Sequence, residues 1–295
     1  MFTHKTVSNT ITTSLKGSSM TNTPETQFSI SQIKRNANFN MKETHVHPHY
    51  EIYYLLSGKC RFFINHSIYV LNKGDILAIE KGSLHKSTYL EVRTHERIVI
   101  NFTDEFAAPL YEEFGRELVL KCFKNPHMTI PASRREYVDD LMRKMELEYK
   151  TQDMFSERLL KYHLYELLIF LIRCQEFQYN TIEELDAGDE AIQRAAKYIC
   201  MNYHTPITLA DAAKQANMSP SFFSRKFKRT TGFGFKEYLN HVRLKEASSL
   251  LLKTNDSITN IALRCGYNDS NYFGDVFKKI KGIPPYLYRK NKGIM

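Results

Sequence analysis

The sequence has none of the marks of an exported or membrane-anchored protein. Its five cysteines, Cys60, Cys122, Cys174, Cys200 and Cys265, are odd in number and widely spaced, and no CxxC pair occurs. This pattern predicts reduced thiols in a cytosol. No apolar run approaches the length of a membrane span, and residues 1–26 lack the unbroken apolar segment of a signal peptide. We therefore expect a cytoplasmic protein without a membrane partner, whose residues 1–27 form a disordered tail.

Positive charge is unevenly distributed along a chain of otherwise ordinary globular composition. The hydrophobic fraction is 42% and the charged fraction 25%, as in soluble globular proteins. The net charge is +9, yet residues 190–295 carry 18 Lys and Arg against 7 Asp and Glu, a balance of +11, and the preceding residues sum to −2. Phosphate neutralisation requires such a basic part, so nucleic acid is the expected partner of residues 190–295.

One pattern occurs twice in the last third of the chain. Residues 208–228 and 257–278 each contain small and aliphatic residues at helical spacing, a turn, and then two phenylalanines four positions apart. The offset between the copies is 49 before the turn and 50 after it, because the second turn has one extra residue. Each copy predicts two short helices joined by a tight turn. This is a helix-turn-helix, whose second helix can enter the major groove of DNA.

The outward-facing side chains of the second helices are the candidate DNA contacts. The expected base contacts are Ser221, Ser224, Arg225, Ser270, Asn271 and Asp275. Arg225 is the strongest of these, because its guanidinium matches guanine O6 and N7. Asp275 either accepts from cytosine N4 or caps its own helix. The expected phosphate contacts are Lys226, Lys228, Lys278 and Lys279, which position the protein without reading sequence.

The segment between the two copies is predicted to be one rigid helix. Residues 235–253 contain regularly placed apolar side chains and no Gly or Pro. Such a helix is roughly 28 Å long at ~1.5 Å per residue. Since one turn of duplex is about 34 Å, two reading helices at its ends would reach successive major grooves. The alternative is a plain helical bundle in which the repeat has no function.

The N-terminal half has a different period. Short apolar stretches separated by turn residues predict strands at Glu51–Leu56, Arg61–Ile64, Ile68–Leu71, Ile76–Ile79 and Arg97–Phe102. Their length and spacing indicate a small barrel or sandwich. The expected fold class is therefore α+β, with an N-terminal β-domain and an all-α C-terminal domain.

Two helices are expected between these domains, at residues 133–149 and 156–177. The second carries a broad apolar stripe, which either packs within the chain or pairs with the same helix of another subunit. Residues 178–189 are polar and acidic and are interpreted as a linker.

The doubled motif, together with the segments SRKFKRTTG, YFGDVFKKIKG and PPYLYR, resembles the DNA-binding domain of AraC/XylS-type transcription regulators over about residues 188–291. The resemblance implies a regulator of transcription that acts as a homodimer, with RNA polymerase as a further expected partner. Activation is the expected mode, and repression stays open.

The segment HVHPHYE and the later Gly74, Gly82 and His85 resemble the two motifs of the cupin fold. In metal-binding cupins the ion is held at the positions of His45, His47, Glu51 and His85. These ligand types suit Fe, Mn, Ni or Zn. Sensor domains that resemble this one also bind small molecules without metal, so a metal site, a metal-free ligand site and a structural role stay open.

The site that follows from this resemblance is an effector site of His45, His47, Glu51, Tyr53 and His85. Its neighbouring aromatic residues suit a sugar, although most of them are expected in the core. No cofactor is expected unless the cupin site holds a divalent metal.

The resulting interpretation divides the chain into a tail (1–27), a cupin-like ligand-sensing barrel (28–132), a helical connector (133–177), a linker (178–189) and a double helix-turn-helix domain (190–295). The predicted function is that of a ligand-responsive, sequence-specific transcription regulator without enzymatic activity. The rival hypotheses are a metal-dependent cupin enzyme and a regulator whose barrel senses a protein partner.

Overall fold

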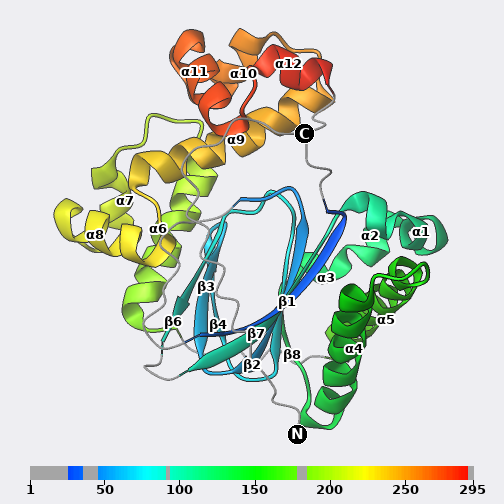
Figure 1. Ribbon diagram of the computed structural model, residues 1–295. Coiled ribbons are helices and arrows are strands. Elements are labelled where there is room, and N and C mark those ends of the chain that lie inside the picture. Colours follow the sequence, from blue (N-terminus) through cyan, green and yellow to red (C-terminus); the bar gives the residue numbers. More distant parts are fainter. Residues whose placement is uncertain (1–25, 36–45, 91–93, 178–184, 292–295) are drawn as a thin grey trace, which may run out of the picture.

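The computed structural model describes residues 26–35, 46–90, 94–177 and 185–291. The predicted tail, except for Thr26 and Gln27, lies outside these residues, as do His45 and positions 178–184 of the predicted linker. Within the described parts, an N-terminal domain of two sheets and a helical hairpin is followed by a C-terminal domain made only of helices (Figure 1). The predicted fold class is confirmed.

Two antiparallel sheets face each other in the N-terminal domain. The first has the order β1-β7-β2-β5-β8 and the second the order β4-β3-β6. The strands are β1 (Phe28–Arg35), β2 (Tyr50–Ser57), β3 (Cys60–Ile64), β4 (Ser67–Leu71), β5 (Asp75–Ile79), β6 (His85–Tyr89), β7 (His95–Phe102) and β8 (His127–Thr129). The five strands inferred from the sequence lie within β2, β3, β4, β5 and β7, while β1, β6 and β8 were not predicted.

Side-chain alternation along β2 separates two cores. Ile52 and Tyr54 pack with the helices that cover the larger sheet. Tyr53 and Leu55 point the other way, into the space between the two sheets. Successive strand residues face opposite sides of a sheet, so one buried strand contributes to both cores. Glu51 has the same parity as Tyr53 and enters the region between the sheets.

Helices cover the outer face of the larger sheet. They are α1 (Asp104–Phe114), α2 (Arg116–Val119), α3 (Lys121–Lys124), α4 (Ala132–Thr151) and α5 (Ser156–Phe177). The sequence predicted α4 and α5 but not the first three. The leucine stripe of α5 (Leu160, Leu164, Leu167, Leu168 and Leu171) is buried in the chain's own core. Packing within the chain therefore explains this stripe.

The C-terminal domain contains α6 (Ala187–Asn202), α7 (Leu209–Gln215), α8 (Pro220–Thr231), α9 (Phe235–Lys253), α10 (Ile258–Arg264), α11 (Ser270–Lys281) and α12 (Pro285–Lys290). Helices α7 and α8 form the first helix-turn-helix, and α10 and α11 form the second. The connecting helix α9 has the predicted bounds and runs from one unit to the other (Figure 1). No helix in the described residues is long and apolar enough to cross a membrane.

Each of the two helix-turn-helix turns contains one residue with a positive φ, an Asn in the first turn and a Gly in the second. Asn217 in the first turn has φ 53° and the equivalent Gly266 in the second has φ 85°. Both values lie in the left-handed region that Gly and Asn tolerate. A Cβ on Gly266 would lie 2.6 Å from the Tyr203 carbonyl oxygen. The second turn therefore needs glycine for space as well as for conformation.

The hydrophobic cores show how the domains meet. The core of the second unit, around Phe273 and Phe277, is a cluster of its own. The core of the first unit, around Phe223 and Phe227, includes side chains from the smaller β-sheet, such as Phe63. The first unit is thus packed against the N-terminal domain.

Candidate DNA interface and effector site

The first recognition helix, α8, is anchored by one face and exposes the other. Phe223 and Phe227 are 0% exposed, and their rings lie 5.1 Å apart. Helix α8 begins at Pro220, whose fixed φ suits the first helical position. Arg225 lies away from the two phenylalanines, and it and Ser221 are exposed. The predicted base contacts of this unit are therefore accessible, Ser224 being half-buried.

The second recognition helix, α11, has the same construction. Its N-cap is Asp269, whose side chain accepts from the Asn271 backbone N–H at 2.8 Å. Asp275 lies inside the helix, so the alternative that it caps α11 is wrong. Asn271 and Asp275 are exposed and Ser270 is half-buried. At the position equivalent to Arg225, this unit presents the acidic Asp275.

The lysines predicted to contact phosphates do not share one environment. Lys228, Lys278 and Lys279 are exposed. Lys226 is half-buried and lies near Asp186 at the start of α6. Burial alone would raise the pKa of Asp186, but a backbone N–H and the charge of Lys226 outweigh it and lower that pKa. Lys226 is thus drawn toward α6.

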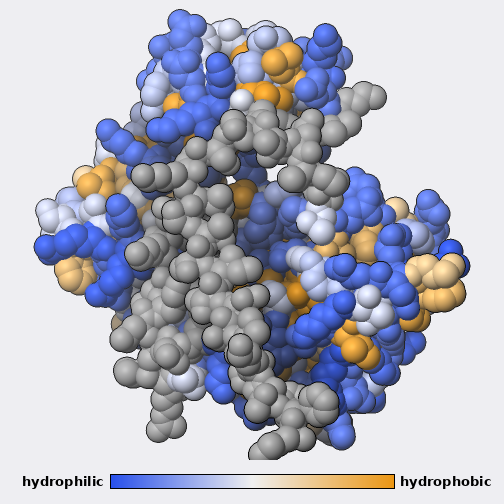
Figure 2. Space-filling model, in the orientation of Figure 1, coloured by the Kyte–Doolittle hydropathy of each residue, from blue (hydrophilic) through white to orange (hydrophobic). Residues whose placement is uncertain are grey.

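Two exposed aromatic residues on the recognition helices were not predicted from the sequence. Phe222 is 49% and Tyr272 54% exposed, and they occupy equivalent positions in the repeat. The offset of 50 pairs these two positions and is a signal available in the sequence, but neither residue was assigned a role from it. In Figure 2 the C-terminal helices present a mainly hydrophilic surface interrupted by separate hydrophobic patches.

The structure brings three of the predicted effector residues together. His47 Nε2 lies 3.0 Å and His85 Nε2 3.9 Å from Glu51 Oε2. The ligand atoms of these three residues lie within 4.8 Å of one another. His45 belongs to the residues that the structure does not describe. Tyr53 lies deeper between the sheets, where its hydroxyl is 3.2 Å from that of Tyr89.

The backbone fixes which nitrogen each histidine turns to the site. His47 Nδ1 lies 2.9 Å from the His49 carbonyl oxygen, and His85 Nδ1 lies 3.0 Å from the Ser83 carbonyl oxygen. A carbonyl only accepts, so each Nδ1 carries a proton and donates. Both Nε2 atoms therefore face Glu51, ready either to bind a metal ion or to carry a second proton. The three residues fit a divalent ion, because carbonyl-held imidazoles are the usual arrangement around one.

Without an ion, this group behaves as a partly buried ion pair. Burial alone would lower the pKa of His47, but the hydrogen bond and charge of Glu51 outweigh it and raise that pKa. Burial would likewise raise the pKa of Glu51, but His47, His85 and Arg97 outweigh it and lower that pKa. Arg97 lies further inside and donates to the Tyr89 hydroxyl at 2.7 Å. The region between the sheets therefore combines charged, hydrogen-bonding and aromatic groups.

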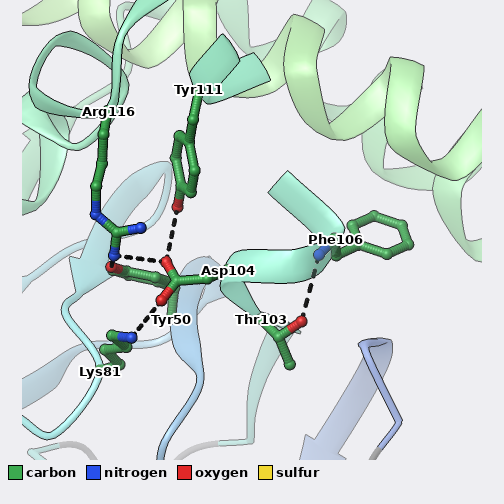
Figure 3. Close-up of polar contacts among 7 residues, drawn as sticks. All are labelled: Tyr50, Lys81, Thr103, Asp104, Phe106, Tyr111 and Arg116. Atoms are coloured by element: carbon green, nitrogen blue, oxygen red, sulfur yellow. Dashed lines mark hydrogen bonds and ion pairs between the residues drawn. The ribbon is translucent and has the colours of Figure 1, made fainter. Parts of the chain in front are cut away.

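A polar cluster fixes the turn beside this site (Figure 3). Asp104, at the start of α1, accepts from Lys81, from Arg116 at 2.7 Å and from the Tyr111 hydroxyl at 3.3 Å. The next residue after Lys81, Gly82, donates its N–H to the His47 carbonyl at 2.9 Å. The Lys81–Asp104 ion pair thus holds the turn that is bonded to His47.

A cavity of about 750 Å³ lies elsewhere, between α4 and α5. Its walls include Arg134, Tyr137, Phe170 and Arg173, and Tyr137 donates to Glu166 at 2.6 Å. Such a volume suits a small molecule. No sequence pattern indicated it, since the lining residues come from the outer faces of two helices.

The N-terminal and C-terminal domains share a polar as well as an apolar contact. Arg61 of β3 forms an ion pair with Asp189 of α6, and their side chains are only 15% and 4% exposed. The Ile68 backbone N–H donates to Gln193 Oε1 at 2.6 Å. Lys86 of β6 donates to the Arg229 carbonyl in the last turn of α8, at 3.1 Å. The smaller sheet thus touches the first recognition helix near its C-terminal end.

Comparison with protein families finds one match in each half of the chain. Residues 212–291 match the helix-turn-helix domain, and residues 50–178 match the ExsA N-terminal regulatory domain. The first match spans both recognition helices. The second spans β2 to α5, including Glu51 and His85.

Several characterised proteins resemble most of the chain. The transcriptional activator RhaR of Mannheimia succiniciproducens is 28% identical over 83% of this chain and 86% of its own. The raffinose operon regulatory protein RafR of Pediococcus pentosaceus is 28% identical over 87% of this chain and 90% of its own. Among solved structures, an apo form of ToxT from Vibrio cholerae is 15% identical, covers 90% of this chain and 98% of its own, and has a TM-score of 0.40.

Proposed function

Because the chain belongs to the AraC/XylS family of transcription regulators, we propose that α8 and α11 read successive major grooves under the control of an effector bound in the N-terminal domain. The carrying observation is the pair of exposed recognition helices joined by α9, which has 19 residues and is ~28 Å long. The relatives act as regulators of transcription, a role without catalysis, so the chain is not an enzyme.

Within this proposal, Arg225 makes the main base contact in the first groove. Its exposure supports the assignment, and an arginine that binds guanine in a bidentate manner discriminates by about 1–3 kcal/mol. Ser221 and Ser224 flank it. In the second groove Asn271 would read adenine and Asp275 would accept from cytosine N4, with Ser270 beside them.

Phosphate contacts fall to Lys228, Lys278 and Lys279, whose exposure supports this role. Lys226 keeps this assignment only if DNA draws it away from Asp186. The excess of basic residues in residues 190–295 supplies the general attraction to the duplex.

The effector site is proposed at His47, Glu51 and His85, with His45 and Tyr53 as further members. A sugar is the proposed class. This is supported by hydrogen-bonding groups next to aromatic rings, and by relatives named for a raffinose operon and a lactose operon. A divalent ion is the second candidate, because both imidazoles turn Nε2 toward Glu51. A bound ion would offer an open coordination position to a ligand.

We further propose a cytoplasmic homodimer that contacts RNA polymerase as an activator. The leucine stripe of α5 is buried within the chain. We therefore place the dimer contact elsewhere on the hairpin formed by α4 and α5. The end of the hairpin exposes Leu147, Met154, Phe155 and Tyr162. Sedimentation of the wild-type chain and of Phe155→Glu would test this face; unchanged dimers in the variant would exclude it.

Selection from random duplexes tests the DNA-reading proposal directly. We expect the purified chain to enrich two short motifs about one helical turn apart, with affinity that falls steeply with salt. Arg225→Ala should lose preference at one position of one motif. Failure to enrich any duplex over competitor, with and without candidate sugars, would refute the proposal.

Calorimetry with a sugar panel and with Zn²⁺ or Mn²⁺ tests the effector proposal. Binding that is lost in His85→Ala but kept in Arg173→Ala would support the site between the sheets. The reverse result would move the effector to the cavity between α4 and α5. If none of these sugars or ions binds, the result would favour a protein partner as the effector.

A further inference from the structure

The turn between β3 and β4 is where the proposed effector site meets the DNA-binding domain. Asn65 occupies this turn with φ 54°, a conformation that Asn adopts more readily than most residues. Its side chain donates to Ser83 Oγ at 3.3 Å and accepts from the Leu84 N–H at 3.2 Å. Its own N–H donates to the Leu84 carbonyl at 2.7 Å. Three hydrogen bonds thus fasten Asn65 to the segment that leads into His85.

The same segment positions the histidines. The Ser83 carbonyl accepts from His85 Nδ1 at 3.0 Å, and the Gly82 N–H donates to the His47 carbonyl at 2.9 Å. A ligand that draws the two Nε2 atoms together or apart therefore acts on residues 82–85. Asn65 must follow any such movement or lose its bonds to them.

On its other side, Asn65 is bonded to the first turn of the connecting helix α9, which packs against the first helix-turn-helix. Its carbonyl accepts from the hydroxyl of Tyr238 in α9. Tyr238 is 0% exposed, and its hydroxyl also lies 3.2 Å from Cys200 Sγ of α6. Its ring packs against Phe227, the buried anchor of α8, with centroids 5.3 Å apart. A shift of the Asn65 carbonyl would therefore displace Tyr238, which lies where α6, α8 and α9 meet.

We infer that Asn65 is a positioning residue that couples the His47–Glu51–His85 site to the first helix-turn-helix through the Tyr238 hydroxyl. This inference rests on the proposed function, since it assumes that the site takes an effector and that α8 reads DNA. By linkage the coupling is reciprocal: if a ligand bound at the site changes DNA affinity by some factor, DNA changes the affinity for that ligand by the same factor.

Double-mutant cycles test the link without knowledge of the effector. His85→Ala alters the site, and Tyr238→Phe removes only the hydroxyl that reaches Asn65. In the wild-type background we expect His85→Ala to change affinity for a selected duplex on the order of tenfold, within the usual range of coupling between sites. In the Tyr238→Phe background the same change should have less than about a twofold effect, because the cycle isolates the interaction between the two positions.

Two further variants separate positioning from simple packing. Asn65→Gly keeps the backbone conformation but deletes the side-chain bonds, so it should abolish the effect of His85→Ala as Tyr238→Phe does. Asn65→Asp retains the oxygen that accepts from the Leu84 N–H, and its second oxygen can accept from the Ser83 hydroxyl in place of the donated bond, so it should restore the effect. His127→Ala is the matched control, because His127 binds Asp75 in the other sheet. Its effect should be small and equal in every background.

Hydrogen exchange on the full chain, free of DNA and ligand, gives a second readout. Amides in the first turns of α9 should exchange faster in His85→Ala than in the wild type, and Asn65→Gly should remove this difference. Equal effects of His85→Ala in the presence and absence of the Tyr238 hydroxyl, by both measurements, would overturn the link. A chain that selects no duplex but shows the exchange pattern would refute the proposed function and leave the coupling standing.

Discussion

Removal of one partner of the Arg61–Asp189 ion pair should shift the two domains toward undocking without unfolding either. The pair joins β3 to α6, and its side chains are 15% and 4% exposed. A buried charge that loses its partner destabilises its surroundings by about 3–5 kcal/mol. In Asp189→Ala, however, Arg61 regains water as soon as the two faces part. The lost stability should therefore appear as undocking of the two domains.

We use the lower end of this range, about 3 kcal/mol, because Arg61 keeps some contact with solvent. At 1.36 kcal/mol per factor of ten, this corresponds to a shift of roughly 150-fold in the ratio of docked to undocked molecules. The Ile68 amide reports this ratio directly. It belongs to the edge strand β4, and its N–H donates across the interface to Gln193.

We therefore expect Asp189→Ala to accelerate hydrogen exchange of the Ile68 amide by about two orders of magnitude, as measured by NMR. Amides in the β3–β4 ladder should change little. Asp140→Ala is the matched control, since Asp140 pairs with Arg143 on an exposed surface, where such pairs contribute about 0–1 kcal/mol.

A charge-free replacement sharpens the test. Arg61→Met combined with Asp189→Leu removes both charges and fills similar space, and such replacements are often neutral or stabilising. The double variant should exchange at Ile68 almost as slowly as the wild type. Unchanged exchange in Asp189→Ala, or a double variant as fast as the single one, would refute the reasoning.

Three other predictions concern the DNA interface, the fold and the effector site. Arg225→Ala should relax preference at one base position, whereas Lys228→Ala should weaken all duplexes and reduce the salt slope by about one unit; equal losses on specific and random DNA for Arg225→Ala would contradict the assignment. Gly266→Ala should lower the free energy of unfolding by about 1–3 kcal/mol in urea titrations, while Gly274→Ala, in an open helical position, should raise it by roughly 0.5–1 kcal/mol; the opposite order would be inconsistent with the turn geometry. If the site holds a divalent ion, Glu51→Gln should weaken Zn²⁺ or Mn²⁺ binding by about tenfold or more in calorimetry, and unaltered affinity would exclude Glu51 as a ligand.

The repeat made the C-terminal domain predictable because its signals are local. Phenylalanines four apart, a turn residue that tolerates positive φ and an uninterrupted apolar helix specify each unit without reference to the rest of the chain. The extra residue inferred in the second turn follows Gly266, the counterpart of Asn217. Five of the eight strands described in the N-terminal domain were likewise predictable from turn residues and apolar stretches, whereas β1, β6 and β8 were not.

The contacts between domains were not predictable from such signals. Asp189 falls in a segment interpreted as a linker, yet it is buried beside Arg61. Asn65 looked like an ordinary turn residue, and Tyr238 like one of many core aromatics. What gives them a role is the docking of the small sheet on α6 and α9, which joins positions more than 120 residues apart along the sequence.

The proposed effector site was likewise only partly predictable from the sequence. The resemblance to the cupin motifs grouped His47 with Glu51, but β2 begins only at Tyr50, so His47 lies outside the strand that carries Glu51. His47 reaches Glu51 because its Nδ1 is held by the His49 carbonyl. The motif thus named residues that lie together in the structure, but the contact that brings His47 to Glu51 could not be read from it.

The single helix between the reading units has a consequence for operators. Each base pair inserted between the two recognition sequences moves the second away by about 3.4 Å and turns it by about 34–36° around the duplex axis. Helix α9, continuous over 19 residues, has no hinge with which to follow such a rotation. Genuine target sites should therefore keep one fixed number of base pairs between their two halves, even where the bases in that interval vary freely.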